Sequence, residues 1–443
     1  AAALTAAPER AAALAIRSGH PHEARAGAAL VAAAGGWQAV SVECEPPRGL
    51  APWLWLNGAV PVLCAELAPG ELRRLPALPG LHGPLLLATA LEGSFELDGR
   101  PVDSWRLPRP TPQERVELWR PHLDADAAEA LGRQHCHSLG QITQLAAAAR
   151  QQARLDDPSG PIGLQHVRQA ARRGVAGELG SLAELLPESV DDAALVMSPG
   201  LQEALDGLQQ RCLCRENLAD PLGPAARARY RPGVRALFVG ASGTGKTLAA
   251  AWLATRLGLP LYRVDLAGLV SKYIGETEKN LAQLLSRAEH AQVVLLFDEA
   301  DALFGKRTDV KDAHDRYANQ QTNYLLQRIE SFDGIALLTS NSRARFDAAF
   351  ARRLDLIVEF PVPDALARRQ LWEAHLGSAT VCSAADLNRL ATLADLPGGH
   401  VRNVVLAAGT QAGRRGEAIH YADLAAALKA EYLKLGRSPP TGL

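Results

Sequence analysis

The amino-acid sequence predicts an α/β fold in which a parallel sheet with a phosphate-binding loop is followed by a small helical domain, and in which this arrangement occurs twice. Three observations support the prediction. A glycine-rich loop, GASGTGKT (240–247), lies between an apolar strand-like run and a helix-like run. A second apolar run, VVLLFDEAD (293–301), ends in acidic residues, as buried parallel strands do at the ligand-binding edge of a sheet. The segment LPRPTPQERVELWRPHL (107–123) recurs in the second half as FPVPDALARRQLWEAHL (360–376).

Composition and charge limit the classes of function. A chain of 443 residues exceeds what one hydrophobic core usually supports, so we expect several structural units. The 47 Lys and Arg residues balance 48 Asp and Glu residues, and the net charge of −1 disfavours a general affinity for nucleic acid or for an anionic membrane surface. Six cysteines without regular spacing indicate reduced thiols, and neither Cys212-Leu213-Cys214 nor His135-Cys136-His137 has the second ligand pair of a zinc site.

The sequence also bears on location. No apolar run reaches the roughly 18 residues of a membrane span, and the Ala-rich start lacks the basic region of a secretory signal. We therefore expect a cytoplasmic protein. Met197 is the only methionine, so we expect the chain to begin inside a longer product.

The glycine-rich loop has the context that phosphate binding requires. ALFVG (236–240) precedes it as a strand, and TLAAAWLATRLG (247–258) follows it with helical spacing of apolar residues. The glycines allow backbone N–H groups to converge on phosphate oxygens at a helix N-terminus. The alternative, a glycine turn followed by a chance Lys-Thr pair, does not explain the acidic strand downstream. The predicted nucleotide-binding residues of the loop are Gly240, Ser242, Gly243, Thr244, Gly245, Lys246 and Thr247.

Four side chains are predicted to share the work of hydrolysis around this loop. Lys246 can neutralise the β- and γ-phosphates, and the Thr247 hydroxyl can hold Mg²⁺ together with Asp298. Glu299 can polarise the attacking water. A helix N-cap after the strand would explain one acid, but not an Asp-Glu pair downstream of the Lys-Thr pair.

Two further groups complete the predicted site. GIALLTSN (334–341) is typical of a third strand that ends in polar residues, and Asn341 can hydrogen-bond the γ-phosphate or the water. FARRLD (350–355) follows, with Arg352 and Arg353 after a short turn. Two adjacent arginines are most often a solvated surface, but this position is one where an arginine finger is expected.

The combination of GASGTGKT, LLFDEAD, LLTSN and FARRLD resembles the AAA+ ATPases, and within them the branch that remodels proteins, over about residues 190–435. The resemblance implies a phosphate-loop core with a helical lid, ATP and Mg²⁺ as cofactors, and Asn341 as the first sensor. It also implies that Arg352 and Arg353 reach into the site of a neighbouring copy. The active form would then be a ring, commonly a hexamer.

A pore loop is implied by the same resemblance. VSKYIGETEKN (270–280) places an aromatic and a branched apolar residue on a loop that ends in glycine, an unusual position for two apolar groups. In the remodelling branch such a loop grips an extended polypeptide. The alternative is a tyrosine that packs beneath the loop. The candidate pore-loop residues are Lys272, Tyr273, Ile274 and Gly275.

Two other segments have expected roles. FGKRTDVKDAHDRYAN (304–319) is too charged for a core, and we expect a charged rim or a second pore loop. Arg402 in GGHVRN (398–403) resembles the second sensor, which binds nucleotide from the lid.

The repeat indicates a second, degenerate copy of the module in the first half of the chain, because a period of about 250 residues is the length of a whole module. GQITQLAAAA (140–149) also recurs, as GHVRNVVLAA (399–408). On this register Asn57 and Gly58 of WLWLNGA take the places of the two acids, and Ala90 of PLLLATA takes that of the first sensor. Glu23 lies near the place of the phosphate-loop lysine, where a carboxylate would repel phosphate.

These patterns predict the domain organisation. The alternative for the first half is an unrelated N-terminal domain with a chance match. We predict a degenerate core without phosphate-loop and acidic residues at 1–106, its helical lid at 107–173, a linker at 174–200, an active ATPase core at 201–360 and a second helical lid at 361–438. The degenerate module would widen the ring interface or receive a partner.

Three functions are compatible with the sequence. The favoured one is an ATP-driven ring, built of copies of this chain, that threads or disassembles a protein substrate. The arrangement, with the run GKRTDVKDAHDRYAN (305–319), looks most like bacterial ATPases encoded with contractile injection systems. The alternatives are a nucleic-acid-linked AAA+ loader or helicase, which near-zero net charge disfavours, and a scaffold that assembles when it binds nucleotide.

Overall fold

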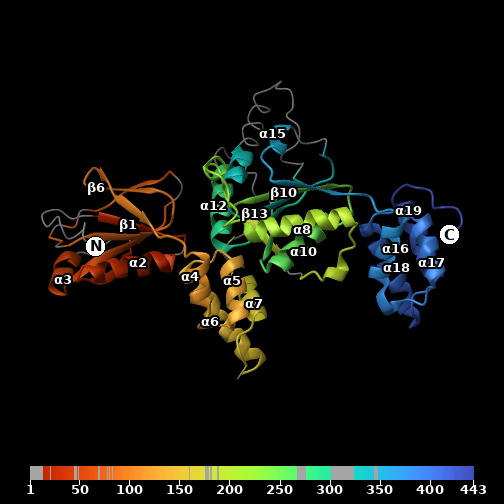
Figure 1. Cartoon of the computed structure of the whole chain (residues 1–443), viewed down its shortest axis with the longest axis horizontal. Coiled ribbons are helices and arrows are strands. Elements are labelled where there is room, and N and C mark those ends of the chain that lie inside the picture. Colours follow the sequence, from red (N-terminus) through yellow and green to blue (C-terminus); the bar gives the residue numbers. More distant parts are fainter. Residues whose placement is uncertain are drawn as a thin grey trace. The chain divides into compact units, whose positions relative to one another are not determined.

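The computed structural model describes residues 13–19, 21–43, 47, 49–67, 70–76, 78, 80–81, 83–158, 160–174, 179, 182–186, 189–266, 276–300, 324–343 and 348–443 (Figure 1). The chain divides into two compact units, Ala1–Val175 and Ala176–Leu443. Each unit contains a parallel sheet followed in sequence by helices, so the predicted α/β fold with parallel sheets is confirmed.

The first unit is built on a five-stranded sheet in the order β2-β3-β5-β1-β8. Every neighbouring pair in this sheet is parallel. The central strands β3 and β5 are buried along nearly their whole length, because apolar residues occupy consecutive positions, as in a sheet covered on both faces. The strand bounds are β1 Ala13–Arg17, β2 Gln38–Glu43, β3 Ala59–Ala65, β5 Leu85–Thr89 and β8 Asp103–Arg106.

Two helices cover this sheet. Helix α2 (Pro21–Ala34) packs on the strands through alanines spaced one turn apart, and these small side chains let the helix approach closely. Helix α3 (Leu50–Leu56) packs through Leu50 and Leu54. A small three-stranded sheet, made of β4 (Leu72–Arg74), β6 (Ser94–Leu97) and β7 (Arg100–Pro101), completes this part of the unit.

A four-helix bundle follows in the first unit and is called lid 1 below. Its helices are α4 (Pro112–Trp119), α5 (Ala125–Gln134), α6 (Leu139–Asp156) and α7 (Leu164–Gly174). Trp119 is fully buried in the lid 1 core. Arg115, one turn before it on α4, is also buried. Its guanidinium tolerates burial because it is hydrogen-bonded: Nε donates to Gly132 O at 2.9 Å and Nη1 to Pro110 O at 2.9 Å.

The second unit has a six-stranded sheet in the order β14-β10-β13-β12-β11-β9 (Figure 1). Its strands are parallel except β9, which pairs antiparallel with β11. Buried strand β10 is followed by helix α10 (Lys246–Leu257). The strand bounds are β9 Ala183–Leu186, β10 Val234–Gly240, β11 Leu261–Val264, β12 Val294–Phe297, β13 Ile335–Ser340 and β14 Leu356–Phe360. The other helices of this core include α8 (Pro199–Cys214), α9 (Pro224–Arg227), α12 (Glu276–Ala291) and α15 (Ala348–Ala351).

The segment expected to be a linker contributes to this second core. Strand β9 and the short helix Asp192–Ala194 both lie between residues 174 and 200. Asp192 accepts hydrogen bonds from the Trp252 indole at 2.8 Å and from Arg256, both on α10. Part of the segment therefore covers the edge of the sheet and braces the helix that follows the glycine-rich loop.

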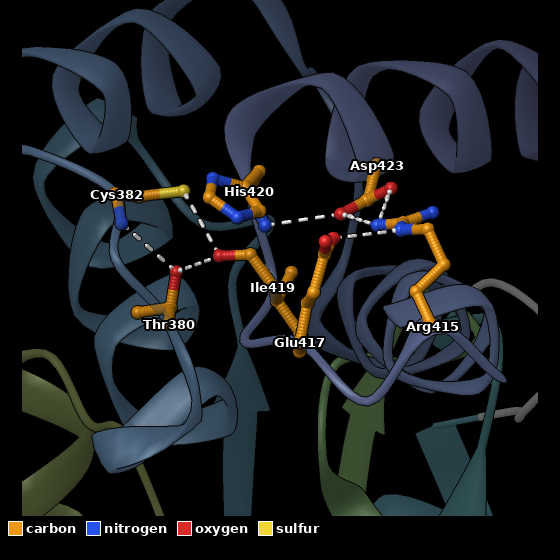
Figure 2. Close-up of polar contacts among 7 residues, drawn as sticks. All are labelled: Thr380, Cys382, Arg415, Glu417, Ile419, His420 and Asp423. Carbon is orange, nitrogen blue, oxygen red and sulfur yellow. Dashed lines mark hydrogen bonds and ion pairs between the residues drawn. The ribbon is translucent and has the colours of Figure 1, made fainter. Parts of the chain in front are cut away.

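A second bundle, called lid 2 below, ends the chain. Its helices are α16 (Ala365–Leu376), α17 (Ala384–Leu393), α18 (Gly398–Arg415) and α19 (Tyr421–Lys434). The turn between α18 and α19 is held by a polar network (Figure 2). Arg415 pairs with Asp423 at 2.7 Å and with Glu417 at 3.0 Å, while the Thr380 hydroxyl donates to Ile419 O at 3.0 Å.

One expectation for the first unit is wrong. WLWLN does not form a strand: its Trp and Leu residues lie in α3, Asn57 is the C-cap of this helix, and Gly58 turns the chain with a φ of 59° into β3. The repeat register placed this segment at the strand that carries the acids, but the segment is helical, Trp53 and Trp55 are exposed, and only one face of the helix is buried. The strand between β2 and β5 is β3, so Asn57 and Gly58 do not take the places of the two acids.

Candidate active site

The glycine-rich loop connects β10 to α10, as predicted. Gly243 and Gly245 adopt φ values of 78° and 97°, a left-handed conformation that favours glycine. Gly245 is the N-cap of α10 and offers no side-chain cap to the helix. Helix α10 therefore begins at the loop, where the N-terminus of a helix can bind an anion.

Lys246 and Asn341 meet beside this loop. The Lys246 side chain is only 8% exposed, and Nζ donates to Gly240 O at 2.7 Å and to Ala241 O at 2.9 Å. Nζ also donates to Asn341 Oδ1 at 3.0 Å. Because β10 and β13 are neighbours in the sheet, the end of β13 brings Asn341 to the lysine.

Thr247 and the acid after β12 also converge here. Thr247 Oγ1 lies 3.4 Å from Asp298 Oδ2 and 3.5 Å from Asp298 Oδ1. A hydroxyl and a carboxylate next to a phosphate-binding loop are the oxygen ligands that Mg²⁺ prefers, so these residues fit the predicted metal. Glu299 follows in a left-handed backbone conformation, with a φ of 52°.

Sequence reasoning missed Thr339. This residue lies in β13, and its hydroxyl contacts both the Asp298 side chain and the Glu299 backbone. The available signal was a hydroxyl residue within an apolar strand, two positions before Asn341.

The two arginines lie on an anchored turn after α15. Arg352 is exposed, and Arg353 Nε lies 3.5 Å from Glu330 Oε2. Asp355 fixes the turn to the sheet, because its carboxylate accepts from Arg235 Nε at 2.9 Å and from Arg211 at 3.3 Å. Among the described residues, neither arginine of the pair joins the Lys246 and Asp298 group within its own chain.

Lid 2 touches the phosphate loop through the start of α18. The Gly399 N–H donates to Gly243 O at 3.0 Å. A Cβ at Gly399 would lie 3.1 Å from Gly243 Cα, so this close approach favours glycine. Arg402, the candidate second sensor, is exposed on the same helix, and burial together with the nearby Arg402 charge lowers the pKa of His375.

Two predicted elements lie outside the described residues. They are the candidate pore loop with Lys272, Tyr273, Ile274 and Gly275, and the charged segment 304–319. Within the described ranges, no helix combines the length and the apolar character needed to cross a membrane.

Comparison with known proteins identifies the class of this site. Residues 236–362 match the model of the ATPase family associated with various cellular activities (AAA). The 26S proteasome subunit RPT4 of Saccharomyces cerevisiae is 30% identical over 191 residues, which are 41% of this chain and 44% of the yeast protein. The proteasome-activating nucleotidase of Aeropyrum pernix is 32% identical over 191 residues, covering 41% of this chain and 47% of that protein.

A third relative is named only by class. The uncharacterized AAA family ATPase y4kL of Sinorhizobium fredii is 39% identical over 131 residues, covering 29% of this chain and 39% of that protein. The chain therefore spans less than half the length of each of these three relatives. The matched family region contains the loop, the acids, Asn341 and the arginine pair, so the candidate site lies within a segment similar to AAA-type ATPase domains, and the match supports ATP hydrolysis at this site.

Proposed function

We propose that this chain assembles into a ring whose ATP sites are shared between neighbouring copies, and that the ring uses hydrolysis to remodel a protein substrate. The observation that carries the proposal is the separation of the hydrolytic groups into two sets. Lys246, Thr247, Asp298 and Asn341 converge on one loop, whereas Arg352 stands exposed on a turn fixed to the sheet by Asp355.

Each residue of the first set has a task set by its position. The loop N–H groups bind the phosphate oxygens, and Lys246, already held beside the loop by two carbonyls, adds positive charge. Thr247 and Asp298 would hold Mg²⁺, which neutralises phosphate charge when it is bound. Glu299 accepts a proton from the attacking water, and the Asn341 amide orients that water or the γ-phosphate. Gly399 ties lid 2 to the loop, so lid position follows the state of the site.

The arginine pair is proposed to complete the site of the next copy. An exposed guanidinium on a rigid turn is suited to stabilise charge on a transferring phosphoryl group. Arg353 is held by Glu330 in the single chain, so we propose that Arg352 makes the first contact across the interface and that Arg353 exchanges partners.

A protein is proposed as the substrate class for two reasons. Two of the relatives are named as a proteasome subunit and a proteasome-activating nucleotidase. The near-zero net charge offers no general attraction for nucleic acid. We propose that Tyr273 and Ile274 grip the substrate, a role that their sequence context supports. The charged run 305–319 supports the narrower proposal of an ATPase of bacterial contractile injection systems.

The first unit is proposed to be a degenerate copy of the same module. Reversed, its strand order β2-β3-β5-β1-β8 matches β14-β10-β13-β12-β11 of the second unit, with β1 in the place of β10. The lids agree in detail: Arg368 Nε donates to Ala391 O and its Nη1 to Pro363 O, as Arg115 does to two carbonyls in lid 1. We propose that this unit enlarges the contact between copies without binding nucleotide.

Mixing of inactive variants tests the shared site. Lys246→Ala removes the phosphate ligand, and the double change Arg352→Ala with Arg353→Ala removes the arginines, so each variant alone should be inactive. In a mixed ring an intact arginine pair can face an intact loop, and random mixing should restore roughly a quarter of the wild-type rate per subunit. Arg369→Ala, a change at an exposed arginine paired with Glu373, is the matched control and should not affect the rate. A mixture no faster than its separate components contradicts the shared site.

A further inference from the structure

Thr339 is a buried polar residue at the centre of the ATP site. It is 1% exposed and lies in β13 after the fully buried Leu337 and Leu338. A buried hydroxyl costs free energy unless it is hydrogen-bonded, so the partners of Thr339 indicate its purpose.

The Thr339 hydroxyl bonds to both acids that follow β12. It donates to Asp298 Oδ1 at 2.5 Å. It accepts the Glu299 N–H at 3.0 Å. The Thr339 carbonyl also accepts the Ala300 N–H at 2.9 Å. One residue therefore holds three consecutive residues of the turn that carries the acids.

Glu299 depends on this support because its backbone is strained. Its φ of 52° lies in the left-handed region, which costs a residue with a Cβ about 1–2 kcal/mol. Such a conformation persists only where the surrounding structure imposes it. The direction in which the Glu299 carboxylate leaves the backbone is set by this turn, so a loosened turn would scatter the carboxylate.

We propose that Thr339 is a positioning residue for ATP hydrolysis, which orients Asp298 and Glu299 through one hydroxyl group. By donating to Oδ1, Thr339 fixes the rotation of the Asp298 carboxylate and leaves Oδ2 near Thr247 at 3.4 Å. By accepting the Glu299 N–H, it holds the backbone from which the proton-accepting carboxylate projects.

The first unit provides a contrast within the same chain. The repeat register places Ala88 where Thr339 stands. Ala88 lies opposite Cys64 in the pairing of β5 with β3, whereas Thr339 contacts Asp298. At this pair of positions the first unit thus has neither the hydroxyl nor the carboxylate, as expected if the hydroxyl serves the acid.

Substitution of the hydroxyl tests the proposal. Thr339→Val keeps the shape and removes both side-chain hydrogen bonds. We expect kcat for ATP hydrolysis to fall about 100-fold, the scale set by misplacement of a catalytic group, while the nucleotide Kd stays within about threefold. Thr339→Ser restores the hydroxyl and should return kcat to within about threefold of wild type. The matched control is Thr89→Val at the end of β5, a buried threonine in the first unit, which should leave kcat unchanged.

Two readouts separate positioning from a general loss of structure. Hydrogen exchange should show faster exchange of the Glu299 amide in nucleotide-free Thr339→Val, with no change in the other β12 amides. In the double variant with Glu299→Gln, the loss of hydrolysis should be clearly smaller than the product of the two single losses, because both changes act in part through the same Glu299 carboxylate.

Other outcomes overturn the proposal. They are an unchanged kcat in Thr339→Val, an equal loss in Thr339→Ser, and a multiplicative loss in the double variant. If Thr339→Val does not fold, Thr339→Cys, which keeps the volume and hydrogen-bonds only weakly, takes its place with the same expected direction.

Discussion

The two sheets of this chain share a strand order but differ at the ends of their strands. In both, apolar residues fill consecutive positions of the central strands, and a helix follows the strand that lies one place in from the edge. At the carboxyl ends the second sheet carries Asp298 and Thr339, whereas the first has Cys64 and Ala88. Packing thus maintains a similar sheet in both units, while the polar side chains at the strand ends, to which we assign the chemistry, differ between them.

The two lids also differ in what the N-terminus of one lid helix, α18 in lid 2 and α6 in lid 1, binds. In the second unit the Gly399 N–H at the start of α18 donates to the phosphate loop at Gly243 O. In the first unit the Gly140 N–H at the start of α6 donates to Glu23 Oε1 at 2.5 Å, and Ser18 Oγ donates to Glu23 Oε2 at 2.7 Å. A carboxylate therefore occupies the N-terminus of the lid helix in the first unit, which supports the predicted lack of phosphate binding there.

The largest expected effect is on the rate of ATP hydrolysis, and it should follow substitution of an acid in the second unit but not of one in the first. Glu299→Gln keeps the shape of the site but removes the proton acceptor, so we expect hydrolysis to slow by about 100-fold or more while ATP still binds. Glu23→Gln in the first unit should leave the rate within about threefold. Steady-state ATPase rates with a fluorescent-nucleotide binding assay measure both. An equal loss from the two changes would mean that the first unit takes part in hydrolysis.

Much of this arrangement could be predicted from the sequence because local patterns encode it. Strand, glycine loop and helix around Lys246 follow from apolar spacing and glycine chemistry, and the lid repeat follows from Pro-x-Pro, Arg and Leu-Trp at fixed positions. Local patterns do not show which strands lie next to one another in the sheet. The position of Asn341 beside Lys246 depends on the order of the strands in the sheet, which these local patterns do not specify.

The differences between the sequence predictions and the structure have physical causes. The repeat register placed residues 53–59 at the acid-bearing strand, but residues 53–56 lie in α3, which exposes both Trp residues, and the strand that follows is β3. Strand β9 has four residues among glycines and acids, too few for a periodic signal. Thr339 gave a weak signal because one hydroxyl residue in an apolar strand is common, and only the register with β12 brings it to Asp298.

A smaller effect is expected from two arginines in equivalent positions of the lids, the buried Arg115 and the partly buried Arg368. Arg115→Ala and Arg368→Ala each leave two carbonyls without their donors, which should cost about 2–3 kcal/mol of unfolding free energy. Urea unfolding measures this loss. Arg368→Ala should also lower ATPase activity, because lid 2 contacts the phosphate loop of its own unit, whereas Arg115→Ala should leave the activity unchanged.

Exposed neighbours serve as controls for the lid comparison. Arg120→Ala in lid 1 and Arg369→Ala in lid 2 each break only an exposed pair within one helix, worth about 0.5 kcal/mol or less. If Arg115→Ala destabilised the protein no more than Arg120→Ala, the shared lid architecture would not depend on the buried guanidinium. If it lowered ATPase activity as much as Arg368→Ala, the two lids would not differ in their relation to the site.

The smallest expected effect is a difference in pH dependence between the lids. Before α19 in lid 2, the His420 backbone N–H donates to the Asp423 carboxylate. Before α7 in lid 1, the Gly163 backbone N–H donates to His166 Nδ1 at 2.9 Å. Hydrogen bonds from Arg415, and then from the His420 backbone, hold the pKa of Asp423 below its usual value. Because the folded pKa is lowered, this contribution to stability is fully present above the unfolded pKa of about 3.9 and is lost as the pH falls from there through the folded pKa.

Asp423→Asn should therefore lower the stability of lid 2 slightly at neutral pH and make its stability fall less steeply as the solution is acidified. Urea unfolding, or hydrogen exchange of α19, measured from neutral pH to about pH 3 checks this. An acid limb as steep in Asp423→Asn as in the wild type would place the acid sensitivity of lid 2 on other carboxylates and leave the Arg415 pair with a purely geometric role in the turn.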